Sequence, residues 1–427
     1  MIKYRKVSSW KFGRNFTKSP QQSLLDLEMT QAEAIYVKRL KGQSFLLCHF
    51  DQLAELNLIS HFQNQSLGVT TQAQDSFQLT NSTFTFGLSD WLSTLQRFLA
   101  VALTQQIETQ TQSVIDIGQM IKQPIEWSLF HLGLQCDLRK ANRSRDLQIL
   151  NLIKLFKQGL NSPYTRLFPS VHGFNSWRLS QRRLSKLLSQ VPSQGPMLAV
   201  NDVYAFTEWQ QHLAESIIWS LLLLEQDSKT MQELKTEVNE ALAQQAYQTD
   251  SLAKLPKLAC FIYEVLRLFP PVWLSSWGKV SDLQNQSDLF QSIKQDLNPQ
   301  TVLMSTALHS HFREIDWPSP FSFQPQRFLG IFYGAQAPQS FVPFGSGAQG
   351  KRQTQIAVHT IASVLSSILR RGRLNIEPSS WLPLQFPLQY GPNTVPEWIG
   401  TGFGIPPQLQ GQFTLDESYI YIPSARI

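Results

Sequence analysis

The residues with the clearest capacity for chemistry lie in a glycine-rich segment, Gly345 to Lys351, which reads GSGAQGK. Its spacing fits the GxxxxGK loop, in which backbone N–H groups surround phosphates and the lysine reaches them. Arg352, however, stands where that loop requires the serine or threonine that holds Mg²⁺. The sequence after it also offers too few strands for the parallel sheet that such a loop opens. Nucleotide binding is therefore disfavoured.

A second set of polar residues combines one acid with two arginines. Glu264 and Arg267 are three positions apart in KLACFIYEVLRLF, so on a helix they share a face and can pair. Downstream, FSFQPQRF presents Arg327 in a rigid turn flanked by aromatic residues. A buried glutamate held between two arginines is satisfied, and loss of one partner costs about 3–5 kcal/mol. We expect an architectural clamp rather than a catalytic group.

Helices dominate the elements that must position these residues. Apolar residues recur at helical spacing from Leu88 to about Gln123, and neither glycine nor proline occurs between Pro196 and Pro256. Further helices are predicted over Asp202–Leu224, Ser228–Gln245, the segment from Pro256 to Pro270, and Gln355–Arg370. Alternation of apolar and polar residues from Glu33 to Leu56 predicts a two-stranded hairpin.

The predicted architecture is mostly α with a minor β portion, in one large domain over residues 1–427. Its β-rich parts are expected at about 33–56, 271–305 and 375–427, and its helical core at about 88–270 and 355–371.

The order of these pieces resembles a known family. The N-terminal hairpin, Trp91, the long central helix, EVLR, the Pro270-Pro271 step, FSFQPQRF and PFGSGAQGKRQ follow one another as in the haem-thiolate monooxygenases, the cytochrome P450 superfamily. The resemblance covers nearly the whole chain and is most diagnostic from Glu264 onward. Ala357 matches the family's alanine six residues after the haem ligand, which sets the register of the glycine-rich loop. The resemblance implies the cytochrome P450 fold.

The same register shows departures in the haem loop, which in the family reads Phe-x-x-Gly-x-Arg/His-x-Cys-x-Gly. Phe344 and Gly347 match the motif, whereas Gln349 replaces the basic residue, Lys351 the cysteine and Gln353 the last glycine. The thiolate that binds iron in the family is therefore missing. A protonated lysine has no lone pair for iron, and a neutral one is disfavoured because the ordinary lysine pKa is about 10.4.

Two further departures concern the haem propionates, which the family pairs with basic residues. Leu95 stands four residues after Trp91 and Trp277 follows the proline step, each in place of such a residue. Two buried carboxylates without cationic partners are costly. The three cysteines lie elsewhere in the chain, at Cys48, Cys136 and Cys260. From these departures we predict a protein without haem or any other cofactor.

The central helix also departs from the family. An ungapped count places the oxygen-activating Ala-Gly-x-Asp/Glu-Thr segment on residues 208–212, with Trp209 replacing the glycine and Gln211 with His212 replacing the acid and alcohol. A shift of one turn would place Glu215 and Ser216 there instead. Trp209 and Trp277 are either partial fillers of the haem slot or ordinary core aromatics.

Three functions remain open. The first is a non-catalytic helper of a partner enzyme in specialised metabolism, as cysteine-less homologues in such families are. The second is a non-oxidative enzyme that cyclises or rearranges an apolar small molecule, with His212, Glu208 or Glu215 as acid or base. The third is a haem-dependent monooxygenase with atypical ligation.

His309 and His311 form the HxH pair, and no metal site is predicted because a third ligand is missing.

The amino-acid composition limits the kinds of partner that the protein can bind. The 427 residues are 42% hydrophobic, 11% aromatic and 16% charged, which excludes a disordered chain. Thirty-seven basic and 31 acidic residues give a net charge of +6, and the basic residues are scattered, which disfavours nucleic-acid binding. The longest apolar run, Ile217–Leu224, is shorter than the about 20 residues of a membrane span. A soluble, cytoplasmic protein with a protein partner or an apolar ligand is expected.

Overall fold

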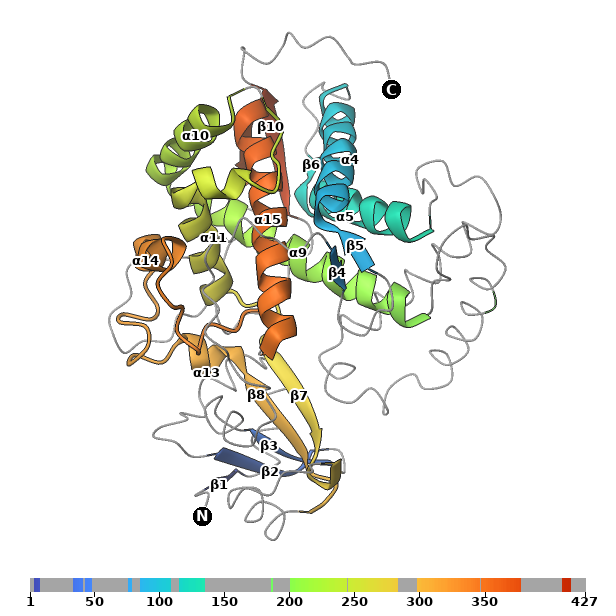
Figure 1. The fold of residues 1–427 in the computed structure, drawn as a ribbon, viewed down its shortest axis with the longest axis vertical. Helices are drawn as coiled ribbons and strands as arrows, with labels where there is room; N and C mark the ends of the chain where they lie inside the picture. The colour runs from blue at the N-terminus through green and yellow to red at the C-terminus, as the bar shows by residue number, and fades with distance from the viewer. Residues whose placement is uncertain are drawn as a thin grey trace. The chain divides into compact units, whose positions relative to one another are not determined.

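The computed structural model describes residues 4–7, 34–40, 43–47, 76–78, 85–108, 115–134, 186, 200–243, 245–282, 298–345, 347–377 and 409–415 (Figure 1). The chain divides into two compact units. The first unit comprises Met1–Gly68, Cys260–Gln355 and Leu382–Gly404, and the second comprises Val69–Ala259, Ile356–Trp381 and Ile405–Ile427. The predicted fold class, mostly α with a minor β portion, is confirmed, whereas the extent of a single domain stays a prediction.

The second unit contains the helical core. Its main helices are α4 (Leu88–Glu108), α5 (Ile117–Leu134), α9 (Val200–Gln226) and α10 (Ser228–Leu242). Helix α5 packs against both α4 and α9, and α10 packs against α9 (Figure 1). Every residue of the run 217–224 is buried. The apolar run therefore forms the centre of this core, as its lack of a polar face predicts.

Helix α15 (Gly347–Arg371) contributes a polar seam to the same unit. The indole Nε1 of Trp91 donates to Thr360 Oγ1 at 2.9 Å, and Gln96 Nε2 donates to Ser363 Oγ at 3.0 Å. The hydroxyl of Tyr247 lies 3.0 Å from His359 Nδ1, and both residues are buried. Burial lowers the pKa of His359 to about 4, so this imidazole is neutral in the folded protein.

Two small sheets complete the second unit. One pairs β4 (Ser76–Gln78) with β5 (Thr85–Gly87). The other places β10 (Gln410–Leu415) between β6 (Ile115–Asp116) and β9 (Gly372–Ile376), antiparallel to both. Gly411 permits this pairing, because a Cβ at that position would lie 2.4 Å from the Asn375 carbonyl oxygen.

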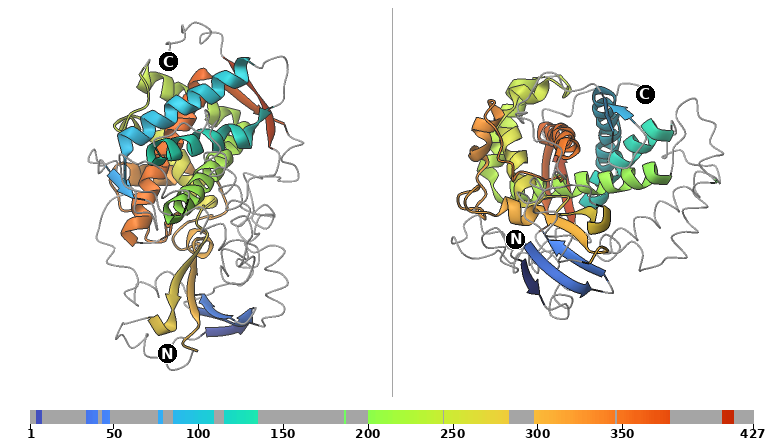
Figure 2. Two further views of the ribbon diagram at one scale, coloured as in Figure 1. Left: turned by 90° about the vertical axis from the view of Figure 1, so that its right-hand side faces the viewer. Right: turned by 60° about the horizontal axis from the view of Figure 1, so that its bottom comes forward.

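The first unit contains a five-stranded mixed sheet of order β1-β2-β3-β8-β7. Its strands are β1 (Tyr4–Val7), β2 (Ala34–Leu40), β3 (Gln43–Leu47), β7 (Leu274–Lys279) and β8 (Val302–Thr306). Figure 2 shows β7 and β8 side by side, extending to the N-terminal strands. The antiparallel pairing of β2 with β3 confirms the predicted hairpin, whose tip at 41–42 lies outside the described residues.

Short helical segments connect these elements. They are η2 (Ser251–Lys254), η3 (Val280–Asp282), α13 (Ala307–His311), η4 (Pro325–Phe328) and α14 (Leu329–Phe332). Helix α11 (Pro256–Leu268) begins where the carboxylate of Glu237 accepts hydrogen bonds from the N–H groups of Lys257, at 2.8 Å, and Leu258, at 2.9 Å. A carboxylate at this end satisfies donors that the helix itself leaves open.

Two helices differ from their predicted bounds. The helical pattern predicted from Leu88 to about Gln123 is interrupted by β6, and α5 then continues through Pro124. The buried stripe formed by Ile117, Ile121, Ile125 and Leu129 supports α5 in spite of the proline. Helix α15 begins at Gly347, eight residues before the predicted start, because its first turn packs into the glycine-rich loop described below.

A membrane-spanning segment was not expected from the longest apolar run. Among the helices that the structure describes, none combines the length and the apolar character needed to cross a bilayer.

Candidate functional site

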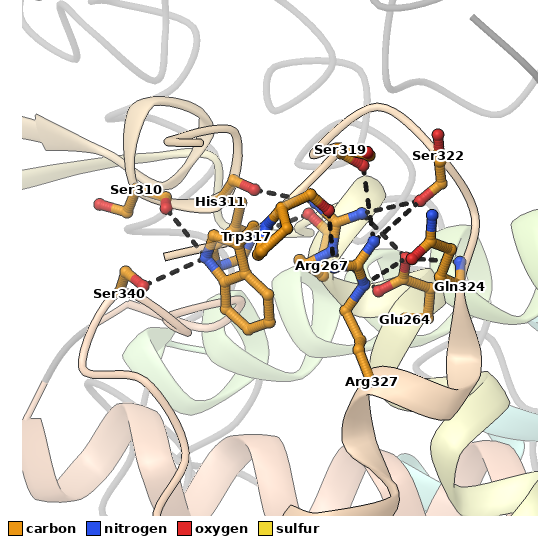
Figure 3. A network of polar contacts seen from close by, with 11 residues as sticks. Glu264, Arg267, Ser310, His311, Trp317, Ser319, Ser322, Gln324, Arg327 and Ser340 are labelled. Carbon is orange, nitrogen blue, oxygen red and sulfur yellow. Dashed lines mark hydrogen bonds and ion pairs between the residues drawn. The ribbon is translucent and has the colours of Figure 1, made fainter. Parts of the chain in front are cut away.

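The predicted clamp residues meet at the C-terminal half of α11 in the first unit (Figure 3). Glu264 and Arg267 are both fully buried, and Arg267 donates from Nε to Glu264 Oε2 at 2.8 Å and from Nη2 to Oε1 at 2.9 Å. Arg327 of η4 donates from Nε to the same Oε1 at 3.2 Å, as does the backbone N–H of Gln324 at 2.9 Å. The buried carboxylate therefore has four donors.

The two guanidinium groups also hold a loop. Arg327 donates from Nη1 to the Pro318 carbonyl at 3.1 Å and from Nη2 to those of Ser319, at 3.5 Å, and Ser322, at 3.4 Å. Arg267 Nη2 reaches the Ser322 carbonyl at 3.3 Å. Ser319 has a φ of +51°, which is unfavourable for a residue with a Cβ. The clamp thus orders the chain between α13 and η4 in a conformation that the sequence alone disfavours.

His311, considered in the sequence only as half of an HxH pair, lies beside the clamp. Its Nδ1 is 2.8 Å from the Arg267 carbonyl oxygen, and its Nε2 accepts the backbone N–H of Val342 at 2.8 Å. Burial lowers the pKa of His311 to about 3, so the ring is neutral and its proton is on Nδ1. With both ring nitrogens bonded to backbone, His311 has no lone pair left for a metal.

Pro343 and Phe344 lead from Val342 into the glycine-rich loop, Gly345 to Lys351. Phe344 is buried, and Gly345 donates its N–H to the Val342 carbonyl at 3.0 Å with a φ of +83°, a conformation that favours glycine. Gly350 is packed so closely that a Cβ on it would lie 2.2 Å from the Gly345 carbonyl oxygen. The Gly350 carbonyl in turn accepts the hydroxyl of Thr354 at 2.8 Å. The backbone at Gly345 and Gly350 is therefore tightly constrained.

Replacement of Gly350 by alanine is expected to lower the free energy of unfolding by about 1–3 kcal/mol, because the added methyl overlaps backbone that cannot shift independently. Gly330→Ala is the matched control, since its Cβ would meet only the Ala335 Cβ at 3.8 Å. Chemical denaturation of both variants measures the difference. Equal midpoints for the two variants would contradict the close packing of the loop.

The residues that depart from the family motif lie at the start of α15. Gln349 is exposed, Lys351 is half-buried and Gln353 is buried, while Gly347 is the first residue of the helix. Burial lowers the pKa of the Lys351 amine from its ordinary value. A cation is disfavoured here, in addition, by the positive end of the α15 dipole.

The residues proposed for acid-base chemistry all lie on α9, in the second unit. Glu215 is buried and accepts a hydrogen bond from Gln211 Nε2 at 2.8 Å. Glu208 and His212 are half-buried, and Trp209 is buried. These positions place the side chains along one helix, but their roles as acid or base stay predictions.

The two remaining pocket residues lie on other elements. Leu95 is fully buried in α4 and is part of the core of the second unit. Trp277 belongs to β7 in the first unit, and its side chain lies outside the described residues. The prediction that Trp209 and Trp277 fill one slot therefore stays a prediction.

The helical core, the glutamate held by two arginines and the glycine-rich loop at the start of a long helix are consistent with the cytochrome P450 fold. Residues 213–389 match the family model of cytochrome P450. This match covers about two-fifths of the chain, and together with the relatives below it supports membership of the cytochrome P450 superfamily.

Curated relatives carry the same family name. Cytochrome P450 4V2 of Pongo abelii is 30% identical over 195 residues, which is 44% of this chain and 36% of that protein. Thromboxane-A synthase of Sus scrofa is 29% identical over 131 residues, or 31% of this chain and 23% of that protein. Cytochrome P450 4B1 of Rattus norvegicus is 27% identical over 197 residues, or 46% and 37%. The alignments thus span about a third of the length of the first of these relatives.

The family match corrects the prediction of a protein without a cofactor. Cytochrome P450 relatives bind haem, so haem is the group that membership indicates, and the prediction of none is wrong at that level. In the register predicted from the sequence, the ligand position would be taken by the amine of Lys351 rather than by a thiolate, and this register stays a prediction. Among the described residues the cysteine is Cys260, buried in α11. The donor set therefore does not fit thiolate ligation.

Proposed function

We propose that this chain is a cytoplasmic helper protein of the cytochrome P450 superfamily, which binds and activates or stabilises a partner enzyme of specialised metabolism. The observation that carries the proposal is the contrast between scaffold and ligand position. The Glu264 clamp has all its partners, whereas residue 351 in the constrained loop supplies an amine. A scaffold kept without the family's thiolate supports a role in binding rather than in oxygen cleavage.

The helper function is tested with the enzymes encoded beside it. Each neighbouring biosynthetic enzyme is assayed alone and with an equimolar amount of this protein, and its turnover and its half-life are measured. We expect a several-fold gain for one of them, together with a complex of the two proteins at a fixed stoichiometry. Haem content is measured in the same preparations, because the family binds haem.

Variants at residue 351 separate the helper from an enzyme. For a helper, we expect Lys351→Ala to retain the gain in partner activity, because the half-buried side chain offers little surface to a partner protein. A monooxygenase with atypical ligation would instead show reductant-driven oxygen consumption that Lys351→Ala abolishes, and that result would overturn the proposal. A non-oxidative enzyme would transform an apolar substrate without oxygen, with a loss of turnover in His212→Ala.

A further inference from the structure

The chain from Ser340 to Gly345 leads into the glycine-rich loop, and His311 is one of its main contacts. Besides accepting the Val342 N–H, the His311 ring stacks on the Phe341 ring, with centroids 5.6 Å apart and an interplanar angle of 22°. Trp317 adds a second link, because its Nε1 lies 3.1 Å from both the Ser310 carbonyl and the Ser340 hydroxyl. Figure 3 shows this group next to the clamp.

His311 is also tied to the clamp by a reciprocal pair of hydrogen bonds. Its Nδ1–H donates to the Arg267 carbonyl at 2.8 Å, and Arg267 Nη1 donates to the His311 carbonyl at 2.9 Å. Arg267 is the arginine whose other nitrogens hold Glu264. A displacement of that guanidinium therefore acts on the backbone and, through it, on the ring of His311.

From His311 the contacts continue to the loop. Val342 donates its N–H to the His311 ring. The carbonyl of Val342 accepts a hydrogen bond from the Gly345 N–H at 3.0 Å. Gly345 packs against Gly350, which precedes Lys351. We infer that His311 is a positioning residue that couples the Glu264–Arg267–Arg327 clamp to the glycine-rich loop carrying Lys351.

The coupling requires one form of the imidazole. Nδ1 has to carry the proton in order to donate to the Arg267 carbonyl, and Nε2 has to keep its lone pair in order to accept from Val342. A phenylalanine would keep the ring stacked on Phe341 but would leave the Val342 N–H buried without an acceptor. A glutamine offers one donor and one acceptor, spaced much like the two ring nitrogens, and can replace both bonds.

Hydrogen–deuterium exchange of the full chain, read on the peptide that spans 341–351, tests this role. We expect His311→Phe to accelerate exchange of this peptide by about tenfold or more, and His311→Gln to restore most of the protection. Wild type and variants are compared at urea concentrations that give them the same global free energy of unfolding. A difference in overall stability then does not contribute to the difference in exchange. His309→Phe, on the same short helix, is the control and should leave the peptide unchanged.

A double-variant cycle tests the coupling itself. Arg327→Lys weakens the clamp with little change in charge or size, and it should accelerate exchange of 341–351 in the wild-type background. In the His311→Phe background the same substitution should have no further effect on that peptide. An equal acceleration in both backgrounds would overturn the coupling, as would His311→Phe exchange no faster than that of His309→Phe.

Discussion

Glu264→Ala is expected to lower the free energy of unfolding by about 3–5 kcal/mol, because the substitution leaves one fully buried and one partly buried guanidinium group without their carboxylate. Arg267 is fully buried and Arg327 partly so, and both donate to Glu264. The backbone N–H of Gln324 loses its acceptor as well. Even a neutral Glu264→Gln should be destabilising, since it keeps the shape but removes the charge that two cations face.

Urea unfolding followed by circular dichroism measures this loss. Asp250→Ala is the matched control, because it also breaks an ion pair, between Asp250 and Lys254 at 3.6 Å, whose side chains are 61% and 55% exposed. A surface pair contributes about 0–1 kcal/mol, so the control should differ little from wild type. Glu264→Ala and Asp250→Ala with similar midpoints would show that the clamp does not stabilise the fold.

Acidification between pH 6.5 and 4 is expected to destabilise the protein through its two buried histidines. Burial lowers the pKa of His311 from 6.5 to about 3 and that of His359 to about 4. In the unfolded chain both rings protonate near pH 6.5, so the unfolded state binds more protons and gains stability as the pH falls. The contribution of each histidine is fully present above pH 6.5 and is lost progressively toward its lowered pKa.

Each histidine should contribute a slope of about 1.4 kcal/mol per pH unit in the middle of this window. Burial raises the carboxyl pKa values of Glu225 and Glu237, which act in the opposite direction, so wild type is compared with variants. His311→Gln and His359→Gln should each flatten the dependence of unfolding free energy on pH, and the double variant should remove most of it. A wild-type dependence that all three variants share would show that other groups cause it.

Local patterns accounted for the helices and for part of the clamp. The spacing of Glu264 and Arg267 places both on one face of α11, since three positions make nearly one helical turn. Apolar residues at 217–224 likewise predicted a buried segment of α9. The early start of α15 was missed because its glycine-rich first turn has low helix propensity and is supported by packing within the loop.

The role of His311 could not be predicted from residue spacing in the sequence. Its partners, the Arg267 carbonyl and the Val342 N–H, are 44 and 31 residues away along the chain and belong to the backbone, whose groups are the same at every position. The sequence analysis considered His311 only as half of an HxH pair and predicted no metal site there. In the fold, both of its ring nitrogens are hydrogen-bonded to backbone groups.

By itself, the sequence determined the helical class, the hairpin and the pairing across one turn of α11, because each depends on residue type and short-range spacing. The register that sets Lys351 against the family's cysteine stays a prediction. Only the tertiary structure decided that four donors converge on Glu264, that His311 joins α11 to the loop, and that Gly350 leaves no room for a side chain. Those features depend on contacts between segments far apart in the chain, and such contacts form only when the core packs.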